Sequence, residues 1–147
     1  MLLIDKGADP KKIECFDGIK KRKKFKPHAI IIEDFLKAKW KYAESRIYLH
    51  DSKNELYKNE QLQIKLKTIK QILDKNSGVA ISMRLGKKSK NPNKIYTHAI
   101  ILDQFTEDYK FAFIRDPWRG VQLKVPMKRL LKKIPHAGVN MIYPVQK

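Results

Sequence analysis

Apolar residues follow two different spacings along the chain, and each spacing predicts one kind of element. Over Ile30–Tyr42 they recur close to the helical period, with Glu33 and Asp34 near the start, where the helix dipole favours acidic residues. Over Leu62–Leu73 the three- and four-residue steps are clearer, and the segment 76–78, Asn-Ser-Gly, ends the pattern. Each of these two ranges is therefore predicted to be a helix.

After this point the apolar residues gather in short runs, which are typical of strands. The predicted strands are 79–83, 96–105, 109–115, 121–125 and 138–145, with a short helix at 126–133. The second and third strands are joined around 106–108, as in an antiparallel hairpin. Helices followed by an antiparallel sheet indicate an α+β fold, in which N-terminal helices pack on a sheet of roughly four to six strands.

The hairpin places two chemically useful side chains near each other. His98 stands at the start of one strand and Asp116 at the end of the next, so both are expected at one end of the sheet. A carboxylate there could accept the imidazole N–H and fix the tautomer, as the third member of a catalytic triad does. The alternative is structural: His98 ends a strand, and Asp116 begins an Asx turn before Pro117.

The residues His-Ala-Ile-Ile-Leu-Asp at 98–103 and Ile-Arg-Asp-Pro-Trp-Arg-Gly at 114–120 carry a resemblance. Together with Gly-Val-Ala-Ile-Ser at 78–82, they resemble the C-terminal half of the papain-like cysteine peptidases. The most similar subgroup is the bacteriocin-leader-processing peptidases and the related papain-fold bacterial toxins and effectors. The resemblance covers roughly residues 60–135 and implies a papain-like domain over 13–147.

In that family the order along the chain is Cys, His, then Asp or Asn, which implies Cys15, His98 and Asp116 as the catalytic residues. The implied activity is thiol-dependent hydrolysis of a protein amide, by a peptidase or a glutamine deamidase, without a cofactor or a metal. Trp118 would line the substrate groove or pack in the core. The chain departs from the family near Cys15: Phe16 follows it directly, and no Gln precedes position 61. A lone Cys is otherwise a small buried hydrophobe.

Charge suggests a competing class of function. Lys and Arg total 33 against 15 Asp and Glu, and only six of the 33 are Arg. The expected polyanion-binding residues are Lys20, Lys21, Arg22, Lys23 and Lys24 in one run, and Lys128, Arg129, Lys132 and Lys133 on the short helix. The alternative to an enzyme is thus a basic binding module, or a papain-fold pseudoenzyme, that binds polyanions weakly or a protein partner. Solvated basic surfaces would give the same pattern.

The start of the chain carries a second resemblance. Residues 2–10, ending in Gly-Ala-Asp-Pro, resemble the end of an ankyrin repeat, so 1–12 is expected to be such an end or a linker. The domain would then act as a bacterial effector on a protein substrate, in the bacterial cytoplasm or inside a host cell.

The sequence also excludes some classes of protein. One Cys excludes an intramolecular disulfide framework. The chain has no apolar run long enough to span a membrane and no secretory signal pattern.

Overall fold

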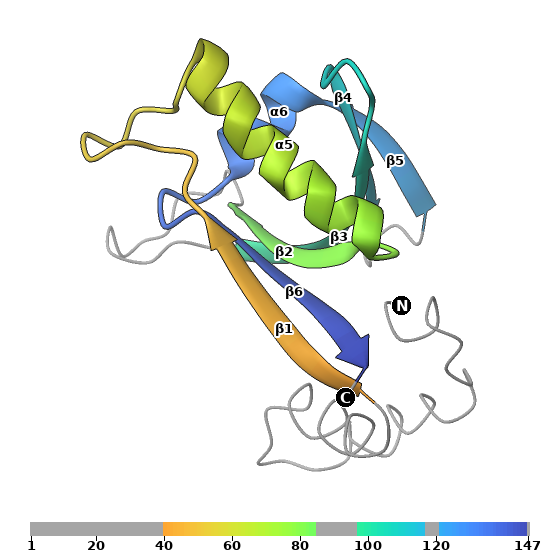
Figure 1. The fold of residues 1–147 in the computed structure, drawn as a ribbon. Coiled ribbons are helices and arrows are strands. Elements are labelled where there is room, and N and C mark those ends of the chain that lie inside the picture. The colour runs from red at the N-terminus through yellow and green to blue at the C-terminus, as the bar shows by residue number, and fades with distance from the viewer. Residues whose placement is uncertain (1–39, 85–96, 117–120, 147) are drawn as a thin grey trace, which may run out of the picture. The chain divides into compact units, whose positions relative to one another are not determined.

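The computed structural model describes residues 40–84, 97–116 and 121–146. Six strands and two helices occur in these ranges (Figure 1). In chain order they are β1 (Trp40–Ile47), α5 (Asn59–Lys75), β2 (Val79–Arg84), β3 (Thr97–Phe105), β4 (Phe111–Asp116), β5 (Val121–Pro126), α6 (Met127–Lys133) and β6 (Val139–Gln146).

The strands form one open sheet in the order β1-β6-β2-β3-β4-β5, and the pairings from β6 to β5 are antiparallel. The expected fold, a papain-like α+β domain with N-terminal helices packed on the sheet, is therefore wrong. Antiparallel strands make up more of the described chain than helices do, and the first described element is a strand. The predicted helix over Ile30–Tyr42 ends inside β1, and its residues 30–39 lie outside the described ranges.

The error at β1 has a physical cause. Exposed Glu44 and Arg46 alternate with half-buried Ser45 and Ile47, which is the period of two that a strand requires. The apolar run before this segment is short, and in a short run the helical and strand periods cannot be told apart.

The contacts within the chain divide it into two units, Met1–Ala43 with Tyr143–Lys147, and Glu44–Ile142. The described part of the first unit consists of the outer ends of β1 and β6, Trp40–Ala43 and Tyr143–Gln146. The second unit contains both helices and the side chains discussed below.

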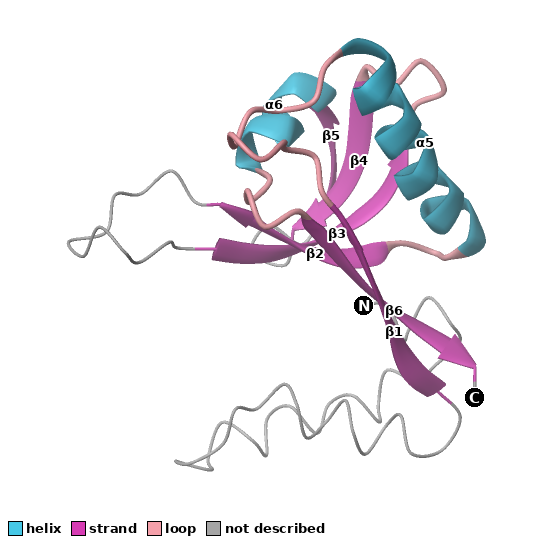
Figure 2. Ribbon diagram, turned by 60° about the vertical axis from the view of Figure 1, so that its left-hand side comes forward, coloured by secondary structure: helices cyan, strands magenta, loops and turns pink. Residues whose placement is uncertain are grey.

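The core of the second unit lies between one face of the sheet and the two helices (Figure 2). Helix α5 contains the predicted range Leu62–Leu73, and its buried residues Leu66, Ile69 and Leu73 recur at helical spacing along one side. Helix α6 adds Leu130 and Leu131 to the same core. The sheet contributes buried residues from three strands: Ile81, Leu102, Phe105 and Val139. Both helices thus cover the same face of the sheet.

A β-bulge interrupts β3 at Asp103. Leu102 pairs with Ile114, but Gln104 pairs with Phe113, so Asp103 is an extra residue without a partner in the ladder. The insertion returns Phe105 to the face that the helices cover, although it lies three positions after Leu102.

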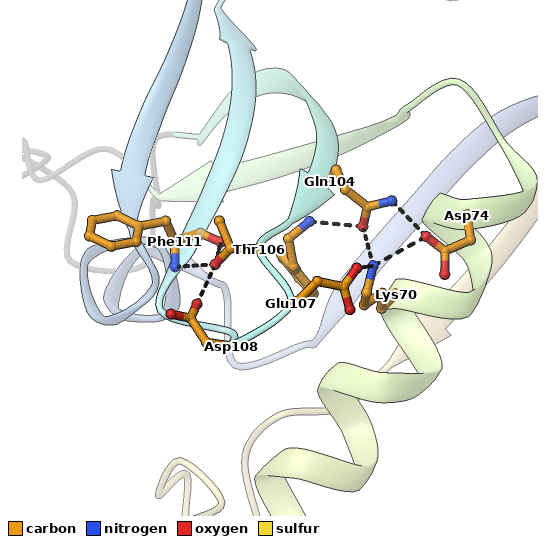
Figure 3. Close-up of polar contacts among 8 residues, drawn as sticks. Lys70, Asp74, Gln104, Thr106, Glu107, Asp108 and Phe111 are labelled. Atoms are coloured by element: carbon orange, nitrogen blue, oxygen red, sulfur yellow. Dashed lines mark hydrogen bonds and ion pairs between the residues drawn. The ribbon is translucent and has the colours of Figure 1, made fainter.

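Polar contacts join the hairpin end of the sheet to α5 (Figure 3). Lys70 donates to Gln104 at 3.3 Å and forms an ion pair with Asp74 at 3.3 Å. The Gln104 amide donates to Asp74 at 2.7 Å, and Lys70 also lies 3.5 Å from Glu107. These contacts hold α5 against the end of β3 that is remote from His98.

The other face of the sheet carries a charged cluster beside the bulge. Arg115 donates to both carboxylate oxygens of Asp103 at 2.8–3.0 Å, and Gln122 donates to Asp103 at 3.0 Å. Gly78 sits against this cluster with φ +104°, and a Cβ there would lie 2.8 Å from Asp103 Oδ1. Glycine is required here by both conformation and space.

Candidate functional site

The structure brings together two of the three side chains that the sequence suggested as catalytic. His98 Nε2 lies 2.7 Å from Asp116 Oδ1. His98 shares its face of β3 with buried Ile100 and Leu102, and Asp116 shares its face of β4 with Ala112 and Ile114. The pair therefore lies on the side of the sheet that the helices cover, at the end away from the hairpin turn.

Burial strengthens the hydrogen bond between His98 and Asp116. The side chains of His98 and Asp116 are 9% and 15% exposed, so water competes little for the hydrogen bond. An ionised carboxylate can only accept, so with Asp116 ionised it is Nε2 of the imidazole that donates this hydrogen bond, and Nδ1 is the other ring nitrogen.

A hollow of about 160 Å³ opens beside Asp116. Met83, Leu123 and Leu130 supply apolar lining, and Arg129 and Lys133 of α6 supply positive charge. Met83 is the ladder partner of His98, but the described lining of the hollow includes Asp116 and not His98. The arrangement offers an imidazole, a carboxylate that orients it, and space with positive charge beside that carboxylate.

The basic residues of α6 are shared between two cavities. Arg129 and Lys133, one helical turn apart, line the hollow at Asp116. Lys128 and Lys132, also one turn apart, line a second cavity together with His50, Arg84 and His136. The polyanion-binding residues expected on this helix therefore do not share a single face.

The remaining predicted site residues lie outside the described ranges. They are Cys15, Trp118, Lys20, Lys21, Arg22, Lys23 and Lys24. Across residues 40–84, 97–116 and 121–146, no group of three or more His, Cys, Asp or Glu could hold a metal ion. Neither described helix is long and apolar enough to cross a membrane.

The second cavity was missed by sequence reasoning. His50, Arg84 and His136 come from three separate parts of the chain and meet only through the packing of a loop, β2 and the segment after α6. No local spacing links them, so the sequence carries no signal for this cluster.

Comparison of this chain with family models, curated proteins and solved structures gave no match. Functional inference therefore rests on the residues themselves.

Proposed function

We propose that this domain is a thiol-dependent hydrolase of protein amides, in which His98 is the general acid–base and Asp116 positions it. The observation that carries the proposal is the 2.7 Å hydrogen bond between two largely buried side chains, with an open hollow beside Asp116. A buried histidine needs a hydrogen-bond partner in any role, so it is the adjacent space that favours a catalytic role over a structural one.

Cys15, the one thiol of the chain, is the proposed nucleophile. Nδ1 of His98 takes the Sγ proton, and the thiolate attacks the amide carbonyl carbon to form a C–S bond. His98 then gives this proton to the leaving nitrogen as the C–N bond breaks, which produces a thioester. Water attacks the thioester and loses a proton to His98. The C–S bond breaks, the thiol regains its proton and a carboxylic acid is released.

The same steps serve a peptidase and a glutamine deamidase, because the leaving group is an amine in the first and ammonia in the second. Arg129 and Lys133 in the hollow favour a substrate with an acidic residue beside the reacting amide. Replacing both by Gln should raise KM for such a substrate with a smaller effect on kcat. Lys75→Gln, at an exposed position in the last turn of α5, is the matched control.

Thiol reactivity tests the proposal without knowledge of the substrate. At about pH 6 an ordinary thiol, with pKa near 8.5, is almost fully protonated. An activated Cys15 should react with iodoacetamide at least about tenfold faster than N-acetylcysteine, and His98→Ala should remove the advantage. His28→Ala is the control, because His28 precedes the same Ala-Ile-Ile tripeptide as His98.

Two results would decide against the enzyme. If Cys15 reacts no faster than N-acetylcysteine, or if His98→Ala leaves its rate unchanged, no thiolate–imidazolium pair forms. The domain would then be a pseudoenzyme or a binding module.

A further inference from the structure

The second cavity has a volume of about 420 Å³, and among the described residues none lines both it and the hollow at Asp116. This volume is within the range of small-molecule sites, roughly 300–1,000 Å³. Arg84, Lys128 and Lys132 supply three positive charges to its lining. Leu56, Leu62 and Leu131 supply an apolar wall.

Two imidazoles complete the cavity. The rings of His50 and His136 are stacked, with centroids 4.7 Å apart and planes inclined by 13°. Within the described part of the chain, His50 Nδ1 is buried and has no hydrogen-bond partner. A buried polar atom without a partner is destabilising and uncommon in folded proteins.

The loop that carries His50 is well ordered by its own hydrogen bonds. The Asp51 carboxylate accepts from the backbone N–H groups of Lys53 and Glu55 at 2.8 and 3.0 Å. His50 also forms an isolated bridge with Leu56. The carboxylate of Asp51, the residue after His50, is therefore engaged by its own loop, and the backbone at His50 is paired with Leu56.

Charge in the cavity depends on the state of His50. Burial, then His136 and Arg84, lower the pKa of His50, and Asp51 opposes them. His50 is thus neutral at pH 7, and the positive charge comes from Arg84, Lys128 and Lys132. A bound anion would oppose the effect of burial, because a neighbouring negative charge favours the protonated ring.

We propose that this cavity binds a phosphomonoester group carried by an apolar organic group. A phosphomonoester has a charge of about −1.5 to −2 near pH 7, which suits three cations better than a single carboxylate does. The Arg84 guanidinium can hold two phosphate oxygens, and the lysines act as point charges. The leucine wall accounts for the apolar part of the ligand. This site does not depend on the proposed hydrolase activity.

Phenyl phosphate is the probe, titrated into the full chain by calorimetry and by the ring proton resonances of His50 and His136. Binding should shift both resonances and weaken at least about tenfold in Arg84→Gln and in Lys132→Gln. Lys75→Gln removes one exposed lysine of α5 and should bind like the wild type. Inorganic phosphate should bind at least about tenfold more weakly than phenyl phosphate, because it cannot contact the leucines.

Three outcomes would overturn the proposal: no shift of either histidine resonance, equal affinity for inorganic phosphate, or unchanged affinity in Lys132→Gln. Lys132 is exposed on α6, so this variant remains informative if Arg84→Gln does not fold. A peptide containing phosphotyrosine identifies the source of the phosphate. Binding at least as tight as that of phenyl phosphate indicates a modified protein, and no binding of the peptide indicates a small molecule.

Discussion

Energetic coupling between His98 and Asp116 can be measured without any substrate, and it tests the element on which the proposed chemistry rests. The perturbation is a double-mutant cycle of His98→Ala, Asp116→Ala and the double variant. Contacts that either side chain makes elsewhere cancel in the cycle, so the coupling free energy reports this pair alone.

The expected size follows from the burial of the pair. Exposed fractions of 9% and 15% and a distance of 2.7 Å describe a largely buried hydrogen bond between an imidazole and a carboxylate. A hydrogen bond to a charged group is worth about 1.5–3 kcal/mol, which is the coupling we expect.

Urea denaturation of the four proteins provides the measurement. With a denaturant dependence of about 1–3 kcal/mol per molar urea, the coupling corresponds to a shift of about 1 M in the midpoint. An exposed ion pair sets the reference, because such a pair couples by about 0–1 kcal/mol. If the coupling of His98 with Asp116 is no larger than this, the argument for an oriented imidazole fails.

Three further predictions concern the fold and its pH dependence. Gly78→Ala should lower the free energy of unfolding by about 2–4 kcal/mol, because φ is positive and a Cβ there would lie 2.8 Å from Asp103 Oδ1 and 2.9 Å from Ile101 Cγ2; an unchanged midpoint in urea would contradict the close approach. Leu66→Ala should lower the free energy of unfolding by about 2–5 kcal/mol, whereas Ile64→Ala, on the exposed side of the same helix, should leave it almost unchanged. Similar losses in the two variants would refute the assigned core. As pH falls below 6.5, the unfolded chain takes up a proton at His50 that the folded chain resists, because burial and its cationic neighbours lower its pKa. The free energy of unfolding should therefore fall with pH in this range and fall less in His50→Asn; parallel curves would exclude this explanation.

Elements whose signal is local could be predicted from the sequence. Helix α5 has regular three- and four-residue steps, and the hairpin of β3 and β4 has a short polar turn, so Leu62–Leu73 and the approach of His98 to Asp116 followed from neighbouring residues. The hairpin prediction needed no knowledge of the rest of the fold.

Features that depend on distant parts of the chain could not be predicted in this way. The helical pattern over Ile30–Tyr42 extended into what is β1, because the pairing partner of a strand is not visible in its own sequence. The cavity with His50, Arg84 and His136 requires three remote segments to meet. Tertiary packing decided both cases.

The bulge at Asp103 has a consequence for how this chain can change in length. Deleting one residue from a regular strand moves every later side chain to the opposite face. Deleting Asp103 would instead leave Leu102 opposite Ile114 and Phe105 opposite Ala112, because Asp103 has no partner in the ladder. The loss would be confined to its contacts with Arg115 and Gln122. Position 103 is thus a place where a related sequence could carry a one-residue gap while its imidazole and carboxylate stay within reach of each other.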